Sequence, residues 1–156
     1  MKKLEKVCTT CELGELEQEP GTVTGGLLHK MYCVQTKQGK YAIKALNSGV
    51  MDKPDALKKL EQAERIAYKL KNENDISAIC VKPVNGKMVF EVDDTYYEIF
   101  EWFDGKSIFY PDITAVHCAK IGEQLGKIHA SNICVEGLYP ENTVRCKYEW
   151  KNLLSA

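Results

Sequence analysis

The sequence predicts an α+β fold: an antiparallel sheet of about five strands with one packed helix, followed by a linker and a C-terminal helix. Two observations lead to this prediction. Segments with alternating apolar and polar residues are separated by turn sequences that contain glycine or paired aspartates. One segment with the apolar spacing of a helix falls among these strands, and another follows them.

Composition limits the class of protein. The 156 residues are 44% apolar and 28% charged, which is ordinary for a folded domain with one core. The 21 basic and 22 acidic residues are mixed along the chain and give a net charge of −1, so neither nucleic acid nor a membrane surface is an expected partner. No segment has the length and hydropathy of a membrane span, and the start "MKKLEKVCTTCELGE" lacks the apolar region of a signal peptide. We therefore expect a cytoplasmic protein.

The first element is expected to be a short helix with an apolar stripe. Leu4, Val7, Cys8 and Cys11 repeat at i, i+3, i+4 and i+7. Cys8 and Cys11 also form C-x-x-C, which could be half a zinc site or a redox pair, but no second pair follows at ligand spacing. The odd total of seven cysteines favours reduced thiols, and the apolar stripe is the preferred interpretation.

Three strands are expected next. They run through "ELEQEPGTVTGG" and "LLHKMYCVQTKQGKYAIKALN". In the second segment Leu28, Lys30, Tyr32, Val34 and Thr36 alternate with His29, Met31, Cys33 and Gln35. Gly25-Gly26 closes one hairpin, and the turn at residues 37–40 closes another. Lys44 falls in the third strand, inside the otherwise apolar run "YAIKAL".

A helix over residues 55–71 should follow, with Asp52 or Asp55 as cap and Pro54 in its first turn. Glu64 lies on the flank of its apolar arc and can reach inward. That arc comprises Ala56, Leu60, Ala63, Ala67 and Leu70.

More antiparallel strands are expected after this helix. They are "ISAICVKPV", "KMVFEV" and "TYYEIFEWF", separated by turns at Asn85-Gly86 and Asp93-Asp94. From Asp112 the spacing is again helical. The shared face of this helix comprises Cys118, Ile121, Gly122, Leu125 and Ile128.

This order of elements resembles the N-terminal lobe of a protein-kinase-like fold. "YAIK" is similar to the V-A-I-K strand of kinases, whose lysine contacts nucleotide phosphates and is held by a glutamate of the next helix. A closer resemblance is to the aminoglycoside phosphotransferase and choline kinase family. It is carried by "GGLLHKMYCV", "GKYAIKALN", "YYEIFEWFDGKSI" and "IGEQLGKIHA", and it covers about residues 16–130.

The resemblance implies an ATP site with the following roles. Lys44 would contact the α- and β-phosphates and Glu64 would hold Lys44, so these two are the candidate catalytic residues. The hairpin over the nucleotide would be formed by Gly25, Gly26, Leu27 and Leu28. Ala42 would face adenine, and the backbone carbonyl of Glu101 and N–H of Phe103 would bond to its edge.

The sequence also departs from the family. It has no G-x-G-x-x-G, and His29 stands where the family has asparagine. It lacks the catalytic-loop pattern His-X-Asp-X-X-X-X-Asn and the later magnesium-binding aspartate. We therefore expect residues 1–103 to be a nucleotide-binding lobe, and 104–156 to be the linker and first helical part of a truncated second lobe.

Several functional expectations follow from that division. The magnesium ligands would belong to the missing lobe, the chain described here would be inactive alone, and no metal site is assigned to its own residues. An apolar strip near Trp102, Phe103 and the helix after Asp112 would be exposed, which makes a homodimer through this surface possible.

Alternatives remain for the residues and for the function. Lys44 can extend from a sheet edge to solvent, Glu64 can be a solvated helix charge, and His29 can be an exposed residue without a chemical task. A non-enzymatic α+β module that binds a protein or a small ligand would use none of them. If the chain is part of a phosphotransferase, the acceptor hydroxyl could belong to an aminoglycoside, choline or a similar small alcohol.

Overall fold

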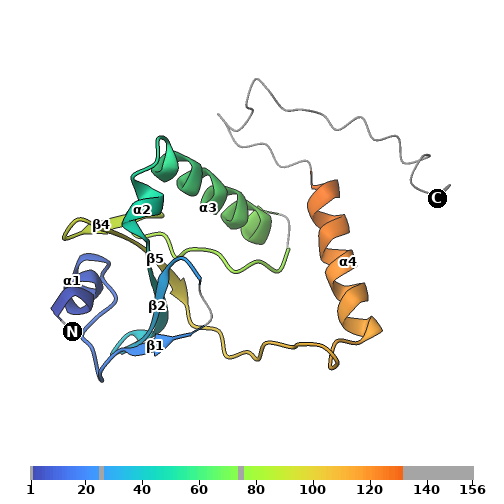
Figure 1. The fold of residues 1–156 in the computed structure, drawn as a ribbon, viewed down its shortest axis with the longest axis horizontal. Coiled ribbons are helices and arrows are strands. Elements are labelled where there is room, and N and C mark those ends of the chain that lie inside the picture. Colours follow the sequence, from blue (N-terminus) through green and yellow to red (C-terminus); the bar gives the residue numbers. More distant parts are fainter. Residues whose placement is uncertain (1, 25–26, 74–75, 132–156) are drawn as a thin grey trace.

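The computed structural model describes residues 2–24, 27–73 and 76–131, and its main feature is a five-stranded antiparallel sheet (Figure 1). The strand order is β1-β2-β3-β5-β4, so the predicted fold class is confirmed. The strands are β1 (Gly21–Val23), β2 (Lys30–Thr36), β3 (Gly39–Ala45), β4 (Phe90–Val92) and β5 (Thr95–Glu101). The helices are α1 (Lys2–Thr10), α2 (Ser48–Met51), α3 (Ala56–Glu73) and α4 (Ala115–Ala130).

Tight turns set the register of the sheet. Thr36 lies opposite Gly39 at the β2–β3 hairpin, so the predicted turn at residues 37–40 is found but is shorter, with Gly39 and Lys40 already in β3. Asn85 and Gly86 have φ values of 51° and 75°, and Asp93 and Asp94 have φ values of 50° and 57°. Two successive residues with positive φ are typical of the hairpin turns whose twist matches that of the strands. The predicted Gly25-Gly26 turn lies outside the described residues.

One face of the sheet packs against α1 and forms the main core. The predicted apolar stripe is confirmed, because Leu4, Val7 and Cys8 of α1 are buried and so is Cys11, just after the helix. They pack with strand residues such as Val34, Ile43 and Ile99, which are fully buried. Burial raises the pKa of Cys8 and of Cys11 to about 11, so these thiols are packing groups. Within the described residues no group of three His, Cys, Asp or Glu side chains could hold a metal ion.

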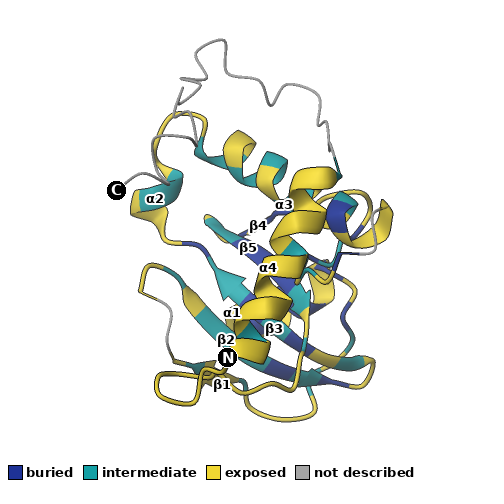
Figure 2. Ribbon diagram, turned by 90° about the vertical axis from the view of Figure 1, so that its right-hand side faces the viewer, coloured by how far each residue is buried: buried dark blue, intermediate teal, exposed yellow. Residues whose placement is uncertain are grey.

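The opposite face of the sheet lies toward α3 (Figures 1 and 2). Side chains alternate between the two faces of a strand. On β3, Tyr41 and Ile43 are buried with α1, so Ala42 and Lys44 belong to the other face, and both are only half-buried. We call this surface the inner face.

The structure corrects three details of the predicted elements. Residues 76–84 form isolated bridges, such as Val81 with Phe100, in place of a regular strand. A short helix, α2, was not predicted. Its N-cap is Asn47, whose side chain accepts a hydrogen bond from the Gly49 N–H. Asp52 is the C-cap of α2 and Asp55 has a φ of 61°, so neither has the extended backbone of an N-cap.

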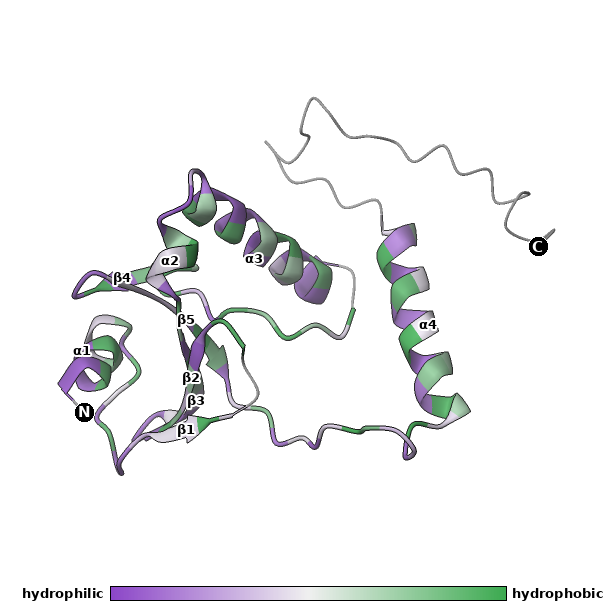
Figure 3. Cartoon of the chain, viewed as in Figure 1, coloured by the Kyte–Doolittle hydropathy of each residue, from purple (hydrophilic) through white to green (hydrophobic). Residues whose placement is uncertain are grey.

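Helix α4 follows an extended segment and keeps its apolar residues exposed. Its contact with the rest of the chain includes a hydrogen bond from the Ser77 N–H to Gln124 Oε1, at 3.3 Å. Figure 3 shows hydrophobic residues along this helix, and Ile121 and Leu125 keep 62% and 49% of their surface exposed. None of the helices in the described part of the chain has the length and hydropathy that crossing a membrane requires.

Candidate functional site

Lys44 forms an ion pair at the centre of the inner face. Its Nζ lies 2.8 Å from Oε2 of Glu98, which is directly opposite on β5. The Glu98 side chain is fully buried, whereas the Lys44 side chain is 22% exposed. A buried carboxylate is costly unless it is paired, so each residue accounts for the presence of the other in an apolar strand.

Glu64 lies beside this pair and is not the ion-pair partner of Lys44 that we predicted. It is half-buried and accepts a hydrogen bond from the Val81 backbone. Burial, the charge of Glu98 and hydrogen bonding with Glu98 raise its pKa, while Lys44 and the Val81 backbone act in the opposite direction. The predicted inward orientation of Glu64 is found. Glu98 takes the direct contact because β3 and β5 place it opposite Lys44.

A cavity of about 330 Å³ lies between the β1–β2 hairpin and Lys44. The two hairpin leucines that we predicted for the nucleotide site line this cavity and are exposed to solvent. Glu98 replaces only part of the water around the Lys44 ammonium. The ammonium can therefore also bind an anion in this open cavity. The lining residues are Val23, Thr24, Leu27, Leu28, His29, Met31 and Lys44.

The ring of His29 lines this cavity, and a hydrogen bond determines which of its nitrogens carries the proton. Its Nδ1 accepts a hydrogen bond from the Asn47 N–H at 3.1 Å, so in the neutral ring the proton is on Nε2. Burial and the charge of Lys44 lower the pKa of His29, and Glu98 partly opposes this. The ring can therefore act as a neutral hydrogen-bond donor at the cavity wall.

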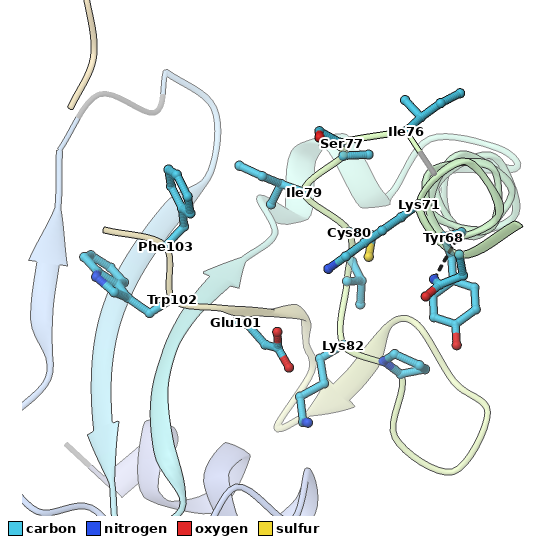
Figure 4. Close-up of a pocket in the computed structure, with 14 residues that line it drawn as sticks. Tyr68, Lys71, Ile76, Ser77, Ile79, Cys80, Lys82, Glu101, Trp102 and Phe103 are labelled. Carbon is cyan, nitrogen blue, oxygen red and sulfur yellow. Dashed lines mark hydrogen bonds between the residues drawn. The ribbon is translucent and has the colours of Figure 1, made fainter. Parts of the chain in front are cut away.

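A second and larger cavity, of about 920 Å³, lies beside the segment that follows β5 (Figure 4). It is lined by Glu101, Trp102 and Phe103, by residues 76–83 and by part of α3. The Trp102 N–H donates to the Lys40 carbonyl at 3.0 Å. Because hydrogen bonding alternates along an antiparallel pair, the backbone groups of Glu101 point away from β3. This is the orientation that contact with the edge of a planar ligand requires.

The predicted site residues fall into two groups joined by β3. Leu27, Leu28 and Lys44 line the hairpin cavity, whereas Glu101 and Phe103 line the larger one. Ala42 lies between the groups on the inner face, opposite Phe100 of β5. Gly25 and Gly26 lie outside the described residues, so their predicted role stays a prediction.

Glu98 was not among the predicted site residues. The signal was present, because a glutamate inside "TYYEIFE" is as unusual in a core strand as Lys44 is in "YAIKAL". Recognising the pair required the β3–β5 register. Strands that are adjacent in a sheet need not be adjacent in the sequence, and β4 and two helices separate these two.

Comparisons with known proteins identify the fold. No family model matches the chain, and no curated protein matches its sequence. The structure of the spectinomycin phosphotransferase APH(9)-Ia in complex with ADP and spectinomycin matches with a TM-score of 0.62 and 13% identity, covering 85% of this chain and 38% of that chain. The Mycobacterium tuberculosis PknI kinase domain matches with a TM-score of 0.51 and 14% identity, covering 72% of this chain and 48% of that chain. The chain therefore has a kinase-like fold and spans less than half the length of these neighbours.

Proposed function

We propose that this kinase-like lobe binds ATP along the inner face of its sheet. The phosphates would lie at the hairpin cavity, where Lys44 supplies positive charge and His29 a neutral donor. Adenine would lie beside Ala42, with its edge toward the backbone of Glu101 and Phe103. Ala42 and Lys44 are two residues apart on one face of β3, a separation of about 7 Å that a nucleotide easily spans.

The observation that carries this proposal is the buried pair between Lys44 and Glu98. A structural ion pair at a sheet centre could be replaced by apolar residues at little cost in stability, and often with a gain. Here the ammonium instead remains partly exposed at the wall of a cavity of about 330 Å³. A lysine held in this way is a fixed charge for phosphate oxygens.

We further propose that the parent reaction transfers the ATP γ-phosphate to a hydroxyl group of a small molecule. The support is the fold and the first structural neighbour, a phosphotransferase in complex with ADP and spectinomycin. An aminoglycoside, choline or a similar small alcohol would be the acceptor. In this fold the acceptor and the magnesium ion are held by motifs that the sequence lacks, so this chain would supply only the nucleotide-binding half of the site.

Two smaller proposals accompany this function. Residues 1–103 would form the nucleotide-binding lobe, and 104–156 would begin a second lobe. We place the protein in the cytoplasm, where ATP is available and thiols stay reduced. The described cysteines are all free thiols, in agreement with that environment.

A nucleotide titration tests the proposal. Thermal unfolding of the chain is followed at increasing ATP, with and without Mg²⁺, for the unchanged protein and for Lys44→Met. ATP should stabilise the unchanged protein by about 1.4 kcal/mol at ten times its Kd, and this increment should be lost in Lys44→Met. Only the shift that ATP causes within each variant is compared, so a lower starting stability of Lys44→Met does not affect the result.

Lys37→Met is the matched control. Lys37 is an exposed lysine in the β2–β3 turn that pairs with Glu15, and it does not line the cavity. It should respond to ATP as the unchanged protein does. An equal response of all three proteins would contradict a nucleotide site at Lys44, and no response of any would favour the non-enzymatic binding module.

A further inference from the structure

The Glu98 carboxylate has one oxygen whose partner is missing. Oε2 accepts the hydrogen bond from Lys44, but Oε1 is buried and no donor of the described residues reaches it. A buried acceptor without a donor costs about 1–3 kcal/mol, more when it is charged. Such an atom is rare in a folded protein, so a donor is expected among the groups that lie near Glu98.

The carboxyl group of Glu64 can supply the missing donor. It lies on α3 close enough to Glu98 for the two carboxyl groups to influence each other, and two carboxyl groups can share a hydrogen bond only if one of them carries a proton. The charge balance agrees with this. Two carboxylates would face one ammonium in a site where Glu98 has no exposed surface, whereas one carboxylate and one acid leave a balanced pair.

The charged and titratable groups around Glu64 come from each neighbouring element. Lys44 on β3 attracts a negative charge on Glu64, and Glu98 on β5 repels one. The Val81 N–H from the segment after α3 donates to Glu64. His29 of the hairpin responds to both Lys44 and Glu98, and it is a neutral ring when its Nδ1 accepts from Asn47. Among these groups, Glu98 is the acceptor to which a protonated Glu64 can donate.

We propose that Glu98 is the residue that positions Lys44 for an anionic ligand, and that Glu64 is held as a neutral acid donating its proton to Glu98. Lys44 is then anchored by the adjacent strand and not by the helix. A displacement of α3 would remove the proton donor from Glu98 but would leave the Lys44–Glu98 pair in place. The positioning role toward a phosphate rests on the proposed function, whereas the shared proton and the anchor do not.

Measurements without nucleotide test the anchor and the proton. The side-chain carboxyl carbons are titrated by NMR, and the Lys44 Nζ resonance is compared among the unchanged protein, Glu98→Gln and Glu64→Gln. The Glu64 carboxyl should titrate above the ordinary glutamate range, and the Lys44 Nζ resonance should move most in Glu98→Gln. A Glu64 titration in the ordinary range, or a larger Nζ change in Glu64→Gln, would overturn the inference.

The pH dependence of stability provides a second readout. Because folding raises the pKa of Glu64, stability should fall as pH rises from about 4.3 through that raised value. Glu64→Gln keeps a neutral donor and should remove this fall, whereas Glu91→Gln, at an exposed position of β4, should keep it. If Glu98→Gln does not fold, Glu98→Asp replaces it, and the carboxyl titration of the unchanged protein still decides the question.

Measurements of ATP binding then distinguish the proposed ATP-binding function from the proposed positioning role of Glu98. Glu98→Gln should weaken ATP binding by about tenfold, since its neutral amide holds the ammonium less firmly. If the carboxyl titration and the Nζ resonance behave as expected but the unchanged protein ignores ATP, only the proposed function fails. If ATP binds and the Glu98→Gln affinity is unchanged, the positioning role fails.

Discussion

Single side chains explain why a charged residue is tolerated inside this sheet. Lys44 interrupts an apolar strand and would be costly there alone, but Glu98 lies opposite it at 2.8 Å. His29 adds a polar ring, and the hydrogen bond from the Asn47 N–H fixes the orientation of this ring. The inner face therefore carries a paired charge at Lys44, and this place opens to the hairpin cavity.

The titration of His29 is the prediction at this scale. Burial and Lys44 lower its pKa, so its NMR titration midpoint should lie below the ordinary histidine value of about 6.5. Because the folded protein then binds this proton less readily than the unfolded chain, the stability that His29 contributes is lost as pH falls from about 6.5 through the lowered value. His29→Asn should remove this component of the pH dependence.

Repeating the His29 titration with ATP tests whether His29 lies near a bound phosphate. A phosphate near Nε2 favours the charged ring, so adding ATP should move the midpoint upward. The resonance of His117, at the start of α4 and bonded to Thr114, should not respond to ATP and acts as an internal control. A His29 midpoint at or above the ordinary value without ATP would contradict the geometry described for the hairpin cavity.

Secondary-structure elements determine which residues meet. The β3–β5 pairing places Lys44 against Glu98, although β5 comes much later in the sequence. That pairing depends on the turns that bring β4 and β5 back to the sheet. The turn at Asn85-Gly86 and the turn at Asp93-Asp94 both use positive φ values, which most side chains tolerate poorly.

Substitution of Gly86 tests whether the turn at Asn85-Gly86 needs a glycine. A Cβ at this position would meet no atom within 4 Å, so Gly86→Ala tests the backbone conformation alone. With φ at 75°, the change should lower the free energy of unfolding by about 1 kcal/mol in urea denaturation. Gly122→Ala, which also meets open space but lies within α4, should instead be neutral or stabilising. Equal effects of the two variants would argue against the turn.

At the scale of the whole molecule, the chain has one well-covered face and one open side. Helix α1 buries the outer face of the sheet, while α4 and the segment before it expose a series of apolar residues. Phe103, Phe109 and Ile121 keep 72%, 73% and 62% of their surface exposed. Apolar surface of this extent favours association with another surface.

Self-association through α4 is the prediction that belongs to this scale. The double variant Ile121→Glu with Leu125→Glu should reduce concentration-dependent association in analytical ultracentrifugation, because both residues are exposed on α4. The midpoint of thermal unfolding should change little, since neither residue belongs to the buried core. If the unchanged protein is monomeric at all concentrations, the proposal of a homodimer through this surface is wrong.

The sequence by itself determined the order of the main elements and the residues worth testing. Strand alternation, turn residues with a tolerance for positive φ, and helical apolar spacing are local signals, so they predicted the five-stranded sheet, the stripe on α1 and the unusual position of Lys44. Residues 76–84 were predicted less well, because their apolar run is compatible with a strand but pairs only through isolated bridges. The tertiary structure alone decided that Glu98 holds Lys44, that Glu64 lies beside the pair, and that His29 is oriented by Asn47. These contacts join residues distant in the sequence, so they depend on strand register and on the placement of α3, which no local pattern specifies.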